Sequence, residues 1–167
     1  LRLPPERIVV RIGDSAYPQA PVAGGSQSTA SVAPAVADAC RALLKRTGGS
    51  IDERAIGTEA TGNATDDYDV EHFSFHSFGA QFCEVRVDED LARVRVSRFV
   101  GVFDCGRIIN PKTARSQMIG GITMGLGMAL FEQSVRDARS GAVVTNNLAD
   151  YHVPTNADVP PIEIAFV

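Results

Sequence analysis

The sequence predicts an α+β fold with two layers, in which helices cover one face of a mixed sheet. Two patterns support this class: apolar residues recur at helical spacing in one stretch and alternate with polar residues in others. We expect a single partial domain over residues 1–167. Its strands are expected near residues 8, 80, 98 and 164, and its covering helices at 30–46 and 111–132.

The first helix follows from one apolar face, which consists of Val32, Val36, Ala39 and Leu43. Gly48-Gly49 is expected to end this helix, because glycine accepts the left-handed conformation of a helix C-terminus. Three hydroxyl residues are candidate caps at its start: Ser28, Thr29 and Ser31. Residues 7–12 predict a short strand before it, whereas the polar residues 47–72 predict an irregular segment after it.

A β-hairpin and a second helix are expected in the other half of the chain. Apolar and charged residues alternate from Cys83 to Val96 around a turn at Asp88-Glu89-Asp90, and the second strand is expected to run on to Phe103. Asn110-Pro111 predicts a helix start, because asparagine caps a helix well and proline suits its first position. Further short strands are expected at 143–144 and 162–166.

Composition places the chain among ordinary globular proteins. Of its 167 residues, 44% are hydrophobic and 22% are charged, which excludes wholesale disorder. Asp and Glu number 20 against 16 Lys and Arg, a net charge of −4, so the basic face of a nucleic-acid-binding protein is not expected. The apolar run Ile119–Leu130 is shorter than the roughly 20 residues that a membrane span requires.

Cysteines and histidines give no sign of a metal site. The cysteines are odd in number and form no Cys-x-x-Cys pair, so we expect buried, reduced thiols rather than a zinc or iron–sulfur centre. They are Cys40, Cys83 and Cys105. The histidines also lack the spacing of metal ligands; they are His72, His76 and His152.

The stretch Gly24-Gly25-Ser26-Gln27-Ser28-Thr29, just before the first helix, carries groups suited to an anion. Its glycines allow close backbone approach, its hydroxyls donate hydrogen bonds, and the free amides of a helix N-terminus attract negative charge. It matches neither the dinucleotide-binding motif nor the P-loop. The residues alone leave two interpretations open, an ordinary capped loop or a cradle for a phosphate or a pterin.

Four glycines interrupt the second helix: Gly120, Gly121, Gly125 and Gly127. Each costs about 1 kcal/mol relative to alanine in a helix interior, so roughly 4 kcal/mol must be offset. Close packing against a sheet or another helix is one explanation, and a ligand or partner backbone lying against this face is the other. Gln117 lies near the start of the helix, and its carboxamide suits the edge of a heterocycle.

A more specific pattern lies within residues 76–130, where Asp104-x-Gly106-x-x-x-Asn110-Pro111 is followed by Gln117 and Gly120-Gly121. Two other stretches accompany it: GGSQSTASVAPAV at 24–36 and DYHVPTNADVPPIEIAFV at 150–167. Together they resemble the molybdopterin-binding subunit of the xanthine dehydrogenase/aldehyde oxidase family. The resemblance is strongest to bacterial aldehyde oxidoreductase large subunits.

The resemblance implies a molybdenum–molybdopterin cofactor, with the cytosine dinucleotide form as an alternative, and no protein side chain bound to the metal. By position it implies cofactor-binding roles for Gly25, Ser26, Gln27, Ser28, Thr29 and Gln117. It also implies iron–sulfur (2Fe-2S) and FAD subunits or domains as partners, together with the remainder of the large subunit. The parent protein is expected in the cytoplasm, export to the periplasm with a partner subunit being the alternative.

The implied activity is the hydroxylation of aldehydes or N-heterocycles, with a glutamate as the general base. In the family this glutamate lies in a glycine-rich segment beyond the equivalent of Val167, so we expect no catalytic residue here. The chain resembles a C-terminal-region fragment of the large subunit and is expected to be inactive by itself. Two other classes stay open, a non-catalytic structural or interaction module and a simple phosphate-ligand-binding domain, and so does a homo-oligomer.

Overall fold

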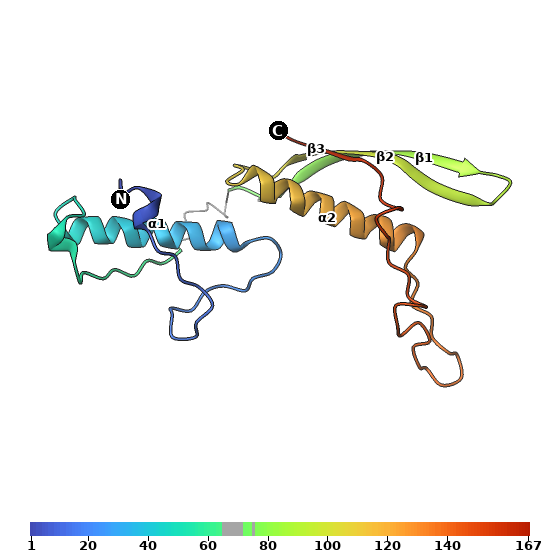
Figure 1. Ribbon diagram of the computed structural model, residues 1–167, viewed down its shortest axis with the longest axis horizontal. Coiled ribbons are helices and arrows are strands. Elements are labelled where there is room, and N and C mark those ends of the chain that lie inside the picture. Colours follow the sequence, from blue (N-terminus) through green and yellow to red (C-terminus); the bar gives the residue numbers. More distant parts are fainter. Residues whose placement is uncertain (65–71, 75) are drawn as a thin grey trace. The chain divides into compact units, whose positions relative to one another are not determined.

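The computed structural model describes residues 1–64, 72–74 and 76–167 (Figure 1). It divides into two compact units, Leu1–Phe73 and Ser74–Val167, which are described separately. The α+β class is confirmed, because the described residues form two α-helices and a three-stranded mixed sheet. All of the sheet lies in the second unit. The predictions of one partial domain and of a helix from the first half covering the sheet stay predictions.

The first unit is built around helix α1 (Ser28–Arg46), which a short 3-10 turn, η1 (Pro5–Arg7), precedes in the chain. The helix ends as expected, since Gly48 has a φ of +73° and the Gly49 amide donates to the Leu44 carbonyl oxygen at 2.7 Å. A glycine-bearing C-terminus therefore ends α1 at Arg46, as predicted, whereas the helix begins two residues before the predicted residue 30.

The segment after a second 3-10 turn, η2 (Glu53–Ala55), returns along α1. The Arg46 guanidinium donates to the Glu59 carbonyl oxygen, and the Asn63 amide donates to Asp38 Oδ2 at 3.2 Å. Gly62 approaches α1 so closely that a Cβ there would meet the backbone of Ala39. These contacts hold residues 59–63 against the helix.

The strand expected at residues 7–12 does not form. Residues 8–12 have no strand partner in the part of the chain that the structure describes, and Val9 and Ile12 are 78% and 87% exposed. A strand persists only where its backbone N–H and C=O groups pair with a neighbour. The apolar, β-branched residues of 7–12 (RIVVRI) suit a strand but do not supply that neighbour, so the prediction was wrong.

The sheet of the second unit has the order β1-β2-β3. Strands β1 (Phe78–Asp88) and β2 (Arg93–Asp104) form the expected antiparallel hairpin, and β3 (Ile162–Phe166) pairs in parallel with β2. Residues 143–144 contribute only an isolated bridge between Val143 and Arg136. A parallel neighbour requires a long crossover, which a helix supplies here.

The hairpin contains a β-bulge at Ser97. Glu84 lies opposite Arg98, whereas the next residue of β1 lies opposite Val96, so that Ser97 is the extra residue. The Ser97 hydroxyl donates to both the carbonyl oxygen and the carboxylate of Glu84. Its hydrogen bond to the carboxylate is the main cause that lowers the pKa of Glu84. A bulge of this kind bends the strand and redirects the side chains beyond it.

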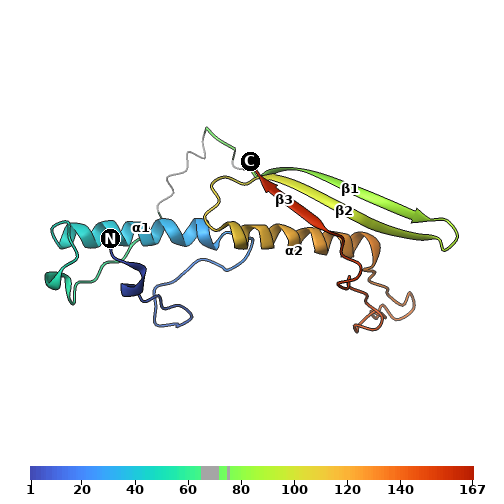
Figure 2. The same ribbon diagram turned by 45° about the horizontal axis from the view of Figure 1, so that its top comes forward.

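Helix α2 (Pro111–Leu130) is the crossover and runs along one face of the sheet (Figure 2). Its predicted cap is confirmed: Asn110 Oδ1 accepts hydrogen bonds from the amides of Lys112 and Thr113 at 3.1 and 3.2 Å. The helix ends two residues earlier than the predicted 132.

The core between α2 and the sheet is small. Ile122 and Leu126 of α2 are each 8% exposed, and Pro160 is the other buried residue with an apolar side chain in the described part of the chain. Gly101 of β2 makes room for the Phe103 ring, since a Cβ placed there would lie 2.6 Å from Phe103 Cε2 and in ordinary contact, at 3.4 Å, with Ile122 Cδ1. Most of the apolar surface of this unit therefore stays uncovered.

The cysteines depart from the expected burial. All three are free thiols, as expected, but Cys83 is exposed and Cys40 and Cys105 are only half-buried. Cys83 is exposed because nothing in the described chain covers β1, whose residues are all exposed.

The sheet face opposite α2 carries an exposed apolar patch. Phe78 and Phe82 of β1 are 66% and 67% exposed, and Phe82 lies directly opposite Val100 of β2. Edge strands and apolar patches of this kind promote association. We therefore predict that the 167-residue chain self-associates at high concentration.

Analytical ultracentrifugation checks this prediction. Phe82→Lys is expected to shift the population toward the monomer, because it charges the patch without touching the core. A wild-type chain that stays monomeric at the highest concentrations would contradict the prediction.

Among the described residues, no helix is both long and apolar enough to cross a membrane.

Candidate functional site

The loop before α1 makes a tight turn. The Gln27 amide donates to the Gly24 carbonyl oxygen at 3.4 Å, and the two residues between them, Gly25 and Ser26, have φ values of +61° and +57°. Two consecutive left-handed residues are the feature of a type I′ turn. Serine adopts this conformation only at some cost, so the turn holds Ser26 in a specific, exposed position at the helix entrance.

The start of α1 differs from the capping prediction. Gln27 occupies the N-cap position, and no side chain caps the helix there. Ser28 and Thr29 lie inside the first turn, and the Ser31 hydroxyl donates backwards to the Gln27 carbonyl oxygen at 2.9 Å. The expected caps were wrong because the helix begins before each of them.

This uncapped start has a chemical consequence. The first amides of α1 have no side-chain acceptor, and its first turn contains no acidic residue. The exposed hydroxyls of Ser26, Ser28 and Thr29 surround the same end of the helix. An anion is the ligand that such an N-terminus attracts.

In the second unit, Gln117 is exposed on α2. Its carboxamide makes no hydrogen bond within the part of the chain that the structure describes. Residues three, four and seven positions further on share its helix face, and these are Gly120, Gly121 and Met124. The face therefore combines a free amide with a shallow strip of backbone.

Packing within the unit explains one of the four helix glycines. A Cβ at Gly127 would lie 2.8 Å from Pro154 Cδ, so this glycine is required by the segment that follows the helix. The other three, Gly120, Gly121 and Gly125, face open space. Their cost in helix stability is not offset by any contact among the described residues.

The segment against Gly127 is anchored by a polar contact. The Tyr151 hydroxyl donates to Glu132 Oε2 at 2.6 Å, and this hydrogen bond raises the pKa of Tyr151. The Glu132 amide in turn donates to the Gly127 carbonyl oxygen at 2.9 Å. The C-terminal end of α2 is thus fixed, whereas the face with Gln117 is open.

The Asp104-x-Gly106 pattern makes a turn between β2 and α2. The Gly106 amide donates to Asp104 Oδ1 at 3.3 Å, and Gly106 has a φ of +75° that favours glycine. With the Asn110 cap, this pattern directs the chain from the sheet into the helix that carries Gln117.

Metal ligands are not grouped in the described ranges 1–64, 72–74 and 76–167, where no cluster of three or more His, Cys, Asp or Glu could hold an ion. His76 shares a hydrogen bond of 2.6 Å with the Ser74 hydroxyl, and His152 shares one of 3.0 Å with the Ala149 carbonyl oxygen.

Comparison with known proteins identifies the family. Residues 49–160 match the family described as the molybdopterin cofactor-binding domain. The chain belongs to this family. The whole of this molybdopterin cofactor-binding chain is 33% identical to the aldehyde oxidoreductase molybdenum-binding subunit PaoC of Escherichia coli K12, of which it covers 26%.

Two further similarities agree with this assignment. Over 54% of its length, the molybdopterin cofactor-binding chain is 46% identical to 12% of the putative xanthine dehydrogenase molybdenum-binding subunit XdhA of Escherichia coli K12. A solved structure, the quinoline 2-oxidoreductase of Pseudomonas putida 86, superposes with a TM-score of 0.57 and 30% identity, covering 75% of this chain and 15% of that one. The chain spans about a quarter of the length of PaoC.

The predicted site residues of this molybdopterin cofactor-binding chain fall in both units. Gly25, Ser26, Gln27, Ser28 and Thr29 lie in the first unit and Gln117 in the second. Of these, Gln117 lies within the range that matches the family. The prediction that the two groups meet around one cofactor stays a prediction.

The sequence interpretation missed two residues of the open face. Met124 and Met128 are 68% and 70% exposed and lie seven and eleven positions after Gln117. That spacing places them on the same side of a helix and would have indicated them. Methionine adapts its shape to irregular surfaces, so these side chains extend the face toward whatever contacts it.

Proposed function

We propose that this chain holds part of the molybdopterin cofactor in a molybdenum hydroxylase that oxidises aldehydes or N-heterocycles. The observation that carries the proposal is the match of residues 49–160 to the molybdopterin cofactor-binding domain. The names of PaoC and XdhA support the two substrate classes. Because the chain spans about a quarter of PaoC, the activity is proposed for the whole enzyme.

The residues present fit the cofactor chemically. The uncapped amides of α1 and the hydroxyls of Ser26, Ser28 and Thr29 suit its phosphate. The free carboxamide of Gln117 suits the polar edge of the pterin, and the open glycines beside it allow a flat ring to approach the backbone. The cofactor supplies the two-electron redox chemistry when bound, and these residues bind and orient it.

Three finer features belong to the same proposal. The cofactor is the cytosine dinucleotide form or the simpler molybdopterin form, and the phosphate-binding groups of α1 suit either. The electrons leave through 2Fe-2S and FAD subunits or domains, which accords with PaoC and XdhA being named as molybdenum-binding subunits. We propose the cytoplasm as the compartment of the complex, with export to the periplasm as the alternative.

The first test of this proposal replaces Gln117 by alanine in the full-length enzyme. One hydrogen bond to a polar ligand contributes about 0.5–1.5 kcal/mol, so we expect cofactor binding to weaken by roughly 2- to 12-fold. The molybdenum content per polypeptide should fall in cells grown with limiting molybdate, as measured by mass spectrometry of the purified enzyme.

Gln133→Ala is the matched control, because Gln133 is also exposed but lies beyond the end of α2. It should leave the molybdenum content unchanged. Ser28→Ala is expected to lower the content as Gln117→Ala does. Equal molybdenum in wild type, Gln117→Ala and Ser28→Ala enzymes would refute the assignment of these residues.

A second test uses the 167-residue chain alone. We expect no oxidation of benzaldehyde or xanthine with a dye as electron acceptor, because none of its residues is assigned as the general base. The assay measures dye reduction by chain purified away from other oxidases. Turnover that follows the chain through purification would show that a catalytic group had been overlooked.

A further inference from the structure

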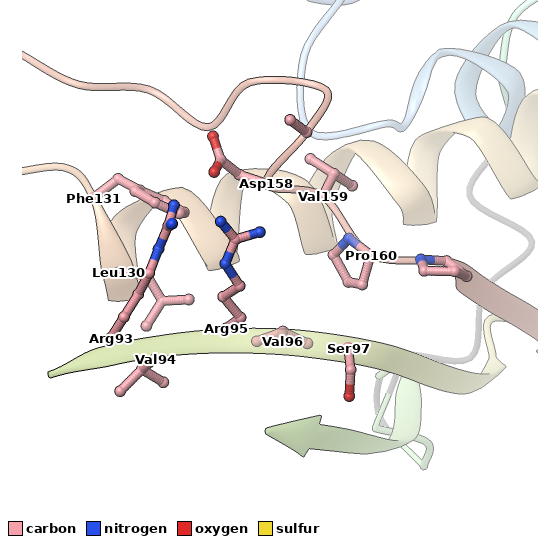
Figure 3. A pocket seen from close by; sticks show the side chains of 12 residues that line it. Arg93, Val94, Arg95, Val96, Ser97, Leu130, Phe131, Asp158, Val159 and Pro160 are labelled. Carbon is pink, nitrogen blue, oxygen red and sulfur yellow. The ribbon is translucent and has the colours of Figure 1, made fainter. Parts of the chain in front are cut away.

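A pocket of about 230 Å³ lies at the N-terminal end of β2, within the second unit (Figure 3). One side is formed by β2 from Arg93 to Ser97. The other is formed by the end of α2 with Phe131, and by residues 157–161. None of the residues proposed above to bind the cofactor lines this pocket.

Two positive charges project into the pocket. Arg93 and Arg95 are alternate residues of β2, and Figure 3 shows both guanidinium groups pointing toward the segment that carries Asp158, while Val94 points the other way. In the described part of the chain, no carboxylate oxygen lies within 4.0 Å of either guanidinium group. Their fixed N–H donors are therefore available.

The acidic residue of the pocket is already engaged elsewhere. Asp158 Oδ2 accepts hydrogen bonds from the Thr155 amide at 3.0 Å and from the Thr155 hydroxyl at 2.6 Å. These bonds, and then the charges of Arg95 and Arg93, lower the pKa of Asp158, so it is ionised at neutral pH. Two guanidinium groups and one carboxylate leave the pocket with a net charge of +1.

Ser97 also lines the pocket, but Figure 3 shows its hydroxyl on the side of β2 away from Asp158. The other walls are apolar and include Val96, Leu130, Phe131, Val159 and Pro160. An inorganic anion would satisfy the arginines and leave these walls wet, whereas a neutral apolar ligand would leave two charges unpaired. A ligand with a carboxylate on an apolar body satisfies both halves of the pocket, because guanidinium groups bind carboxylates in a planar, two-point geometry.

We propose that this pocket binds a carboxylate carried on an apolar body, with Arg93 and Arg95 holding the carboxylate and Leu130 and Phe131 contacting the rest. The carboxylate belongs either to a free small acid or to an acidic side chain of a polypeptide flanked by apolar residues. The proposal rests on the pocket alone and is independent of the proposed cofactor role.

Isothermal titration calorimetry of the full chain tests the proposal with three probes. Benzoate represents the free acid, acetyl-Leu-Glu-Leu-amide represents the polypeptide, and benzamide is the neutral control. We expect benzoate or the peptide, or both, to bind with millimolar affinity and benzamide not to bind. Binding of benzoate identifies the small acid as the source, and binding of the peptide alone identifies the polypeptide.

Variants locate the binding. Arg95→Gln is expected to weaken it by about tenfold or more, the effect of losing a charge-assisted hydrogen bond. Arg139→Gln is the matched control, because Arg139 is 94% exposed in the same unit and its ion pair within the described residues is with Asp137, outside the pocket. Asp158→Asn keeps the acceptor for Thr155 and removes a negative charge, so it should tighten binding about threefold. Circular dichroism checks that each variant is folded.

Three results would overturn the proposal. They are the absence of binding by both anionic probes, an equal loss in Arg139→Gln and Arg95→Gln, and weaker binding by Asp158→Asn. The second would mean that the probes respond to the diffuse charge of the surface, and the third that the Asp158 carboxylate does not repel the bound anion, as the charge argument requires. None of these results would bear on the cofactor assignment, which the molybdenum content tests separately.

Discussion

Leu126→Ala is expected to lower the free energy of unfolding of the second unit by about 2 kcal/mol or more. Removal of a buried leucine side chain loses its transfer free energy and leaves a cavity. Apart from Pro160, Leu126 and Ile122 are the buried apolar side chains among the described residues, so little other apolar burial is available to compensate. Urea unfolding followed by circular dichroism measures the change.

Met128→Ala provides the control for this experiment. Met128 lies two residues further along the same helix but is 70% exposed. Both substitutions introduce alanine into α2 and gain similar helix propensity, so that effect cancels in the comparison. A change within about 0.5 kcal/mol is expected for Met128→Ala. Equal losses in the two variants would mean that the contact between α2 and the sheet is not the core of this unit.

Alanine is expected to have opposite effects at two glycines of α2. Gly121→Ala should raise the free energy of unfolding by about 1 kcal/mol, because it improves helix propensity and faces open space. Gly127→Ala gains the same propensity, but its Cβ would lie 2.8 Å from Pro154 Cδ. Overpacking of this kind costs about 1–3 kcal/mol, so a net loss of roughly 1 kcal/mol is expected.

The same urea titration measures both variants, and molybdenum content separates stability from function. In the full-length enzyme, Gly121→Ala should bind less molybdenum although the isolated chain is more stable, since the new methyl group occupies the strip beside Gln117. If Gly121→Ala retained full molybdenum content, the open glycines would not be part of the cofactor face. If it destabilised the chain, a contact absent from the described residues would cover them.

Local chemistry made much of the fold predictable. Asn110 and Gly48 each determine a helix boundary through their own side chain or backbone, and the alternation from Cys83 to Val96 specifies a hairpin within one short stretch. The start of α1 was less predictable, because several hydroxyl residues compete there and the helix begins before all of them. The strand expected at 7–12 does not form, because pairing depends on a neighbouring strand that a short run of apolar, β-branched residues does not specify.

The candidate site was predictable to a similar degree. The residue types around Ser26 and Gln117 indicated an anion and a heterocycle, and the structure adds that the α1 amides are uncapped and that the Gln117 carboxamide is free. The left-handed conformation of Ser26 carries no sequence signal, because asparagine or aspartate is the usual non-glycine residue there. The pocket that contains Arg93 and Arg95 depends on contact between β2 and residues 157–161, two distant segments whose proximity no local pattern indicates.

The parallel pairing of β2 with β3 has a consequence for the order of folding. Phe99 pairs with Ile162, so the third strand joins the sheet only after α2 and the segment after it have been synthesised. The β1–β2 hairpin closes a short loop and forms early, whereas closing the longer loop costs more entropy and slows the final step. During synthesis on the ribosome, one edge of β2 therefore stays unpaired until Ile162–Phe166 emerge. We expect chaperones to bind the chain mainly during that interval, because an unpaired strand edge is prone to aggregation.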